Sequence, residues 1–202
     1  MDSELVLQDE DEIEVELGDV AEVQVVHFGS NFRVDWQQND KRRNCIKIKG
    51  KTYYAVQFHF HAPSEHTLSG QHEAMELHLV HQASDGSLAV VAIFFKEGKE
   101  NEFLAQFWNE LPAIPSEGED EVTATSTNKI DAASLQLLQG KFFRYRGSLT
   151  TPPYSEGVEW VIMQEIAEAS LAQLEHYRST IPSPNAREVQ PRNHRLVTLR
   201  QC

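Results

Sequence analysis

Alternating apolar and polar residues run through most of the chain and predict a protein built mainly from β-strands. Successive strand residues point to opposite faces, so alternation indicates a strand with one buried face. The pattern is clear where Phe32, Val34 and Trp36 alternate with polar residues, and the continuous apolar run 88–95 fits a buried strand. Strands are expected at 13–17, 22–27, 32–36, 46–49, 53–61, 74–82, 88–95, 141–146 and 157–164.

Two segments have the three- and four-residue spacing of helices. One follows Asn101, and the other follows Ser170, a residue type that is typical of the N-cap position. Helical turns are therefore expected at 103–111 and 171–177, with a shorter one at 135–138. Because strands dominate and no repeat or linker divides the sequence, we expect one mainly β (α+β) domain over residues 1–202.

Composition and charge narrow the function. Acidic residues outnumber basic ones by 31 to 18, and the net charge of −13 argues against nucleic acid as a partner. No apolar run is long enough to span a membrane, and residues 1–12 lack the pattern of a signal peptide. Cys45 and Cys202 lie far apart, so no disulfide framework is expected and the compartment, cytoplasmic or periplasmic and secreted, stays undetermined.

The histidines carry the clearest chemical signal, since six of nine lie between residues 54 and 81. In the predicted strand 53–61, His59 and His61 share one face, while Phe58 and Phe60 point to the other. His78 lies on one face of the next predicted strand. If the two strands pair, three imidazoles converge.

Three neutral imidazoles with an open fourth position are typical of catalytic zinc. Gln57 and Glu76 each precede a histidine by two residues, where they can accept a ring N–H and fix its orientation. The alternative is a polar face on a half-buried sheet. His66, His72 and His81 are interpreted as surface histidines or as packing and hydrogen-bonding residues.

Three blocks of sequence agree in order and spacing with one family: QFHFHAPSEHTLSGQHEAMELHLVH, LAVVAIFF and GSLTTPPYSEGVEW. From about Phe28 to Arg195, the chain resembles the α-class carbonic anhydrases, especially the bacterial type. The resemblance implies a large, mostly antiparallel twisted sheet with a few short peripheral helices. It also implies a zinc lyase that interconverts carbon dioxide and bicarbonate by attack of zinc-bound hydroxide, with zinc on His59, His61 and His78.

The same resemblance implies roles for further residues. Gln57, Glu76 and the backbone carbonyl of Asn185 are expected to orient the ligands. Glu65 and Thr150 match a gatekeeping pair in which the threonine hydroxyl donates to the glutamate. The residues alone also allow these two to be ordinary loop residues. The expected substrate pocket consists of Val80, Val90, Leu149, Thr151, Val158 and Trp160, which could otherwise simply be core.

Three features depart from the family pattern. Ser30 occupies the position of the usual proton-shuttle histidine, and serine does not titrate near neutral pH, so turnover is expected to depend on buffer. His27 is a candidate substitute. No counterpart of the aromatic-rich opening of the family precedes Asp2, and Tyr154 stands where many secreted members have a disulfide cysteine.

Two alternatives to a carbonic anhydrase stay open at this point. One is a non-catalytic carbonic-anhydrase-like binding module, although such relatives typically lack one or more ligand histidines. The other is a cupin-like barrel with a His-x-His metal site. A homodimer is also considered, because an exposed acidic strand at 13–17 could pair between two copies.

Overall fold

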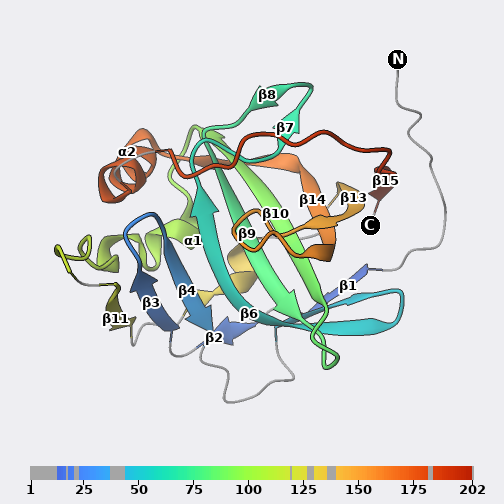
Figure 1. Cartoon of the computed structure of the whole chain (residues 1–202). Coiled ribbons are helices and arrows are strands. Elements are labelled where there is room, and N and C mark those ends of the chain that lie inside the picture. The colour runs from blue at the N-terminus through green and yellow to red at the C-terminus, as the bar shows by residue number, and fades with distance from the viewer. Residues whose placement is uncertain are drawn as a thin grey trace.

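A large twisted sheet dominates the structure (Figure 1), a computed structural model in which residues 13–16, 18–20, 23–36, 44–118, 120–126, 130–135, 140–181 and 184–201 are described. Eleven strands form the sheet in the order β11-β3-β4-β6-β9-β10-β14-β13-β15, with β5 paired to β6 and β1 paired to β5. Their bounds are β1 Ile13–Glu16, β3 Val23–His27, β4 Phe32–Trp36, β5 Cys45–Ile48, β6 Lys51–His61, β9 Met75–Gln82, β10 Leu88–Glu97, β11 Val122–Ser126, β13 Lys141–Ser148, β14 Glu156–Ala169 and β15 Thr198–Gln201.

The prediction of a mostly antiparallel sheet is confirmed, because β10 and β14 form the one parallel pair among the described strands. Each of the nine predicted segments contains a strand. The short edge strands β11 and β15 were not predicted, since each is defined mainly by its pairing with β3 or β13. Two small sheets pair β2, Asp19–Val20, with β12, Ile130–Asp131, and β7, Thr67–Leu68, with β8, Gln71–His72.

The described helices are short and lie at the periphery of the sheet. Helix α2, Leu171–Thr180, begins as predicted at Ser170, which forms a capping box with Gln173. The predicted helix 103–111 is wrong in length. Helix α1 covers only Glu102–Ala105, and a separate 3₁₀ turn, η1, covers Trp108–Glu110. Phe107 and Trp108, at the break between the two turns, are both buried in the core.

The predicted short helix at 135–138 is found slightly earlier, as the 3₁₀ turn η2 at Ala132–Leu135, and Leu138 lies outside the described residues. None of the described helices has the length and apolarity that a membrane crossing requires. Cys45 is a buried free cysteine, and Cys202 lies outside the described part of the chain.

The main core lies on one face of the sheet and is rich in aromatic side chains. Phe58 and Phe60 of β6 are both fully buried there, as the alternation predicted. Their rings belong to a cluster of edge-on and tilted contacts, which are favourable geometries for aromatic pairs. The cluster is completed by Phe32, Trp36, Phe95, Phe103, Phe107, Trp108 and Tyr177.

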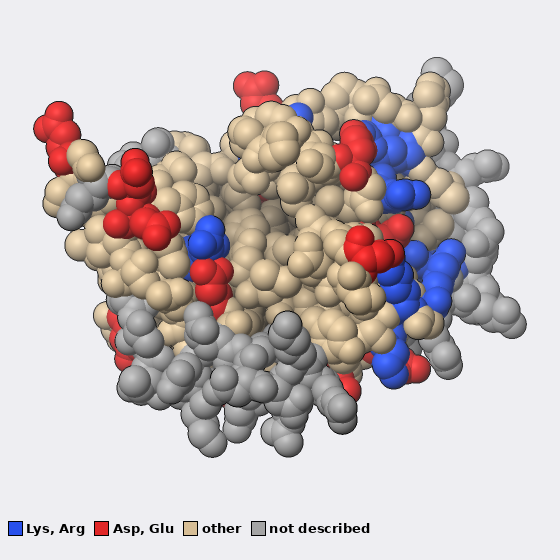
Figure 2. All heavy atoms as spheres, turned by 60° about the horizontal axis from the view of Figure 1, so that its bottom comes forward, with Lys and Arg blue, Asp and Glu red and all other residues tan. Residues whose placement is uncertain are grey.

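Charged side chains on the face seen in Figure 2 are mixed in sign where they are most dense. Lys and Arg gather on one side of that face, with Asp and Glu between them. Two arginines of the C-terminal half are paired in this way: Arg144 lies 3.0 Å from Glu159, and Arg195 lies 3.1 Å from Glu156. The described part of this face therefore offers no extended basic surface of the kind that binds a phosphate backbone.

Candidate metal centre and active site

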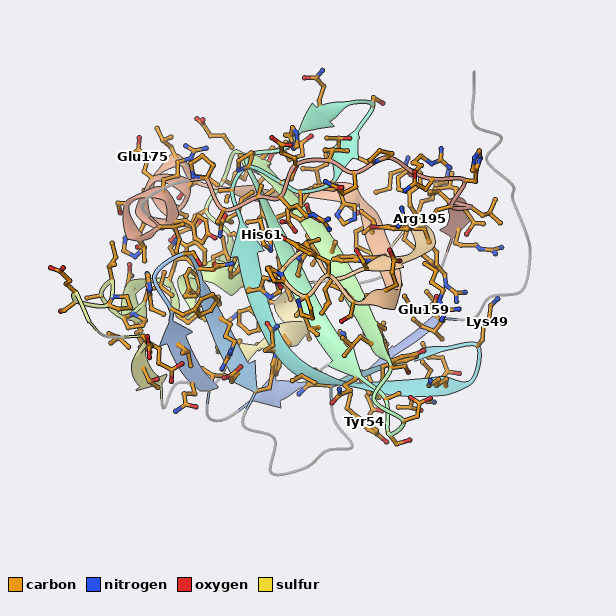
Figure 3. The ribbon with its side chains drawn as sticks, viewed as in Figure 1. Lys49, Tyr54, His61, Glu159, Glu175 and Arg195 are labelled. Atoms are coloured by element: carbon orange, nitrogen blue, oxygen red, sulfur yellow. The ribbon has the colours of Figure 1, made fainter. Side chains whose placement is uncertain are left out.

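Pairing between β6 and β9 brings the predicted histidines together. The register places His59 directly opposite His78, with Phe58 opposite Leu79 and Phe60 opposite Leu77. Opposite residues of an antiparallel pair share a face, so the phenylalanines and leucines enter the core while the histidines lie on the other side. Figure 3 shows His61 on β6, near the place where the C-terminal segment crosses the sheet.

The three imidazoles form a compact group. One ring nitrogen from each of His59, His61 and His78 lies within 4.8 Å of the others. The ring centroids are 5.1 Å apart for His59 and His61, 5.2 Å for His59 and His78, and 4.7 Å for His61 and His78. This spacing suits three nitrogens around one ion, because zinc binds histidine nitrogen at about 2.0–2.1 Å.

Each ring is held through its other nitrogen. Nδ1 of His59 lies 2.8 Å from the Gln57 side-chain oxygen. Nδ1 of His61 lies 3.0 Å from the backbone carbonyl of Asn185. Nε2 of His78 lies 3.0 Å from a carboxylate oxygen of Glu76. Each acceptor places the ring proton on the nitrogen that it contacts. The nitrogens left available to a metal are Nε2 of His59, Nε2 of His61 and Nδ1 of His78. Nε2 of His61 is buried without a hydrogen-bond partner among the described residues.

Burial and electrostatics keep His59 and His61 neutral. Burial, followed by the neighbouring rings, lowers the pKa of His59 well below its usual value. The same two causes lower the pKa of His61 to about 4. Only a neutral imidazole has a lone pair for a metal, so these two rings are ready to bind one at neutral pH.

Glu76 is the centre of a buried network that sequence reasoning recognised only in part. Its Oε1 accepts from the rings of His66, at 2.6 Å, and His78, while its Oε2 accepts from the backbone N–H groups of Glu65 and His66 at 2.7 and 2.8 Å. Burial opposes ionisation, but these two histidines lower the pKa of Glu76 well below its usual range. His66 also lies 2.7 Å from the Tyr145 hydroxyl, so it is a hydrogen-bonding residue, as interpreted from the sequence.

Glu65 lies beside the histidines but does not contact Thr150. Its Oε1 accepts from the backbone N–H of Arg187 at 2.8 Å and lies 3.3 Å from Nδ1 of His61. Its Oε2 is buried, has no hydrogen-bond partner among the described residues and lies 3.9 Å from Nδ1 of His78. The hydrogen bond expected from the Thr150 hydroxyl is thus not formed in this structure, and the contact of Arg187 with Glu65 was not predicted.

A second apolar cluster, separate from the main core, contains most of the predicted pocket. Val80, Val90, Val158 and Trp160 are buried in it, and Leu149 packs against it half-buried. Trp160 reaches the metal site, since its ring lies 4.9 Å from that of His78. Thr150 is half-buried and Thr151 exposed at the start of the loop that follows Leu149.

Gly147 allows two aromatic side chains to pack beside this apolar cluster. The rings of Tyr145 and Trp160 are nearly parallel, 6.2 Å apart. A Cβ at Gly147 would lie 2.6 Å from Tyr145 and 3.1 Å from Trp160, so a larger residue would displace the pair. Gly147 lies one residue beyond the predicted strand 141–146 but inside β13, so the prediction missed this position.

The proposed shuttle positions differ in exposure. Ser30 is exposed in the turn between β3 and β4, next to Gly29, whose φ of 79° favours glycine. His27 is fully buried. Its Nδ1 accepts from the Gly29 N–H at 3.1 Å, and its Nε2 lies 3.1 Å from the Thr180 carbonyl. Both nitrogens of His27 are occupied, so we do not expect it to carry protons to solvent.

Comparisons with known proteins agree with this geometry. The family model described as eukaryotic-type carbonic anhydrase matches residues 2–201. A carbonic anhydrase of Klebsiella pneumoniae is 41% identical over 154 residues, which cover 76% of this chain and 61% of that protein. A carbonic anhydrase of Pectobacterium carotovorum is 34% identical over 174 residues, which cover 86% of this chain and 68% of that protein. The chain thus spans roughly two thirds of the length of these relatives.

Solved structures show the same fold. The α-carbonic anhydrase of Thermovibrio ammonificans, solved with the inhibitor sulfanilamide, has a TM-score of 0.82 and 39% identity, with 92% of this chain and 78% of that chain covered. Dioscorin complexed with ascorbate has a TM-score of 0.84 at 26% identity, with 98% and 82% covered. The fold is therefore shared with a protein that is described by a different ligand. On the family match over 2–201 and the identities to bacterial members, the chain belongs to the eukaryotic-type (α-class) carbonic anhydrase family.

Proposed function

We propose that this protein is a zinc-dependent carbonic anhydrase that interconverts carbon dioxide and bicarbonate. One observation carries the proposal: three histidine nitrogens converge on one point, and the opposite nitrogen of each ring is fixed by Gln57, Asn185 or Glu76. A polar strand face would not need this second set of contacts. Three histidines with room for one further ligand fit catalytic zinc better than a closed structural site.

His59, His61 and His78 would hold the metal. When bound, zinc supplies a Lewis acid that lowers the pKa of a water from 15.7 to about 7 and so provides a nucleophile at neutral pH. Glu76 is negatively charged and accepts a hydrogen bond from the His78 ring. This bond makes the ring a stronger ligand for the metal.

The apolar wall is proposed as the resting place of carbon dioxide. Val80, Val90, Val158 and Trp160 form a buried apolar surface on the histidine side of the sheet, and Leu149 closes one end of it. Carbon dioxide has no net charge and forms weak hydrogen bonds, so an apolar surface next to the nucleophile is an appropriate binding device. Bicarbonate is charged and should leave this surface readily.

Glu65 and Thr150 are proposed to orient the nucleophile through hydrogen bonds. The Arg187 N–H fixes one oxygen of the Glu65 carboxylate, and Oε2 is left as an acceptor. If the Thr150 hydroxyl donates to Oε2 during turnover, its oxygen can only accept a hydrogen bond from the nucleophile. Apo structures often show such contacts longer than they are in the active complex.

Proton release is proposed to depend on buffer. Ser30 occupies the exposed turn where a shuttle would lie, and both nitrogens of His27 are engaged. Serine does not titrate near neutral pH, and both ring nitrogens of His27 are already hydrogen-bonded, which leaves neither free to pass a proton to solvent. Added imidazole should therefore accelerate turnover.

Metal analysis combined with activity tests the proposal. We expect one zinc per chain and carbon dioxide hydration that a chelator abolishes and added zinc restores. His78→Ala should lose both the metal and the activity, whereas His176→Ala, which changes an exposed histidine on α2, should lose neither. Bound zinc without hydration activity would instead support a non-catalytic binding module, and the absence of bound zinc would contradict the metal site itself.

A further inference from the structure

A cluster of buried polar side chains lies directly behind His61. The carbonyl oxygen of Phe60 accepts from Tyr177 Oη at 2.7 Å, from Asn31 Nδ2 at 2.9 Å and from Asn185 Nδ2 at 3.2 Å. Asn185 Nδ2 also donates to the Tyr177 hydroxyl at 2.8 Å, and that hydroxyl lies 3.2 Å from Asn31 Oδ1. Three distant parts of the chain thus meet at one carbonyl.

Asn185 connects this cluster to the metal site. Its side-chain Oδ1 accepts from the Ala62 N–H at 3.0 Å, and its backbone carbonyl accepts from Nδ1 of His61, also at 3.0 Å. The position of that carbonyl depends on the side chain, because no helix or strand holds residue 185. Tyr177 and Asn31 therefore determine where the acceptor for His61 lies.

The cluster is rigid enough to transmit this position. Tyr177 is 1% exposed and Asn31 is 6% exposed. The ring of Tyr177 packs against Phe32, Phe60 and Trp108 with centroids 5.6 to 6.1 Å apart, so its hydroxyl cannot move far. Burial raises the pKa of Tyr177, which keeps the hydroxyl protonated and able to donate. A buried amide that loses one partner has no water to replace it.

We infer that Tyr177 and Asn31 are positioning residues for the metal centre, because they hold Asn185 so that its carbonyl directs Nε2 of His61 toward the metal. The inference rests on the proposed zinc site. It couples helix α2, which carries Tyr177, and the turn between β3 and β4, which carries Asn31, to one ligand on β6. A purely structural role would instead change stability and leave the metal site as it is.

Zinc affinity, measured by competition with a chromophoric chelator, tests the inference without any activity assay. Tyr177→Phe removes only the hydroxyl, and we expect zinc affinity to fall about tenfold, the lower end of the range for groups that orient a ligand. The control is Ser170→Ala, which removes the N-cap of the same helix and costs about 1 kcal/mol of stability without touching the cluster. Its zinc affinity should equal that of the wild type.

Two further measurements make the outcome decisive. Asn31→Ala should weaken zinc binding in the same direction, and it replaces Tyr177→Phe if that variant does not fold. The visible spectrum of Co²⁺ bound to each variant reports the ligand geometry, and it should change in Tyr177→Phe but not in Ser170→Ala. Zinc affinity and spectrum equal to those of the control would overturn the inference. Failure of the wild type to bind zinc would contradict the proposed function instead.

Discussion

Replacing Glu76 by glutamine would test the centre of the site with almost no change in size. The carboxylate is fully buried and accepts four hydrogen bonds, two from the rings of His66 and His78 and two from the backbone N–H groups of Glu65 and His66. Glutamine has one oxygen in place of two. Its NH₂ group must therefore face one of the two pairs of donors.

Either orientation of the amide is costly. Hydrogen bonds to charged groups contribute about 1.5–3 kcal/mol each, so converting two of them into donor–donor contacts should cost about 3–6 kcal/mol of unfolding free energy. If the NH₂ group faces the rings, His78 must carry its proton on Nδ1, the nitrogen that would bind the metal. We expect zinc affinity to fall about 10- to 100-fold in Glu76→Gln, as for other groups that orient a ligand.

Chelator competition for zinc affinity and thermal unfolding of the metal-free protein are the assays. Glu73→Gln is the matched control, because it removes one negative charge from the same connection without changing any of the four bonds. If Glu76→Gln retains wild-type zinc affinity and unfolds at the wild-type temperature, the role assigned to this network is wrong.

Three further predictions concern the proton path, the gatekeeping pair and pH. Ser30→His should raise carbon dioxide hydration in weak buffer, and stopped-flow rates that do not depend on buffer in the wild type would contradict this. Thr150→Ala should lower the hydration rate while zinc affinity stays unchanged; an unchanged rate would remove Thr150 from the mechanism. Burial lowers the pKa of His81 to about 4. The unfolded chain, in which this histidine has a pKa near 6.5, therefore binds the proton first as pH falls, and His81 alone should lower the free energy of unfolding by about 3 kcal/mol between pH 6.5 and 4. Urea unfolding at several pH values measures this drop, and His81→Gln should reduce it; an equal drop in that variant would contradict the assignment.

The ligand strands could be predicted because their pattern is local. Two-residue spacing fixes which side chains share a face, and the short connection between β6 and β9 makes their pairing the simplest arrangement. For the same reason, spacing along the chain is enough to place Gln57 and Glu76 behind His59 and His78.

Contacts between distant parts of the chain could not be read in this way. Nothing near Arg187 in the sequence indicates that its backbone N–H contacts Glu65. The sequence around His66 likewise resembles an ordinary loop and does not indicate its contact with Glu76. The role of Tyr177 was hidden for another reason: its position fits the apolar face of a helix, and only the fold shows that its hydroxyl reaches Phe60. The family resemblance supplied Asn185, which spacing alone does not.

The order in which the site assembles during folding follows from the β6–β9 hairpin. All three ligand histidines lie within 20 consecutive residues and meet through a short loop. Trp160 reaches His78 and Asn185 reaches His61 only after loops of about 80 and about 120 residues have closed, and non-local pairing such as β10 with β14 forms slowly. We therefore expect a chain synthesised only as far as β10 to gather its metal ligands first. A metal captured at that stage would act as a crosslink in the unfinished sheet and favour the later packing of Trp160 and Asn185 against the histidines.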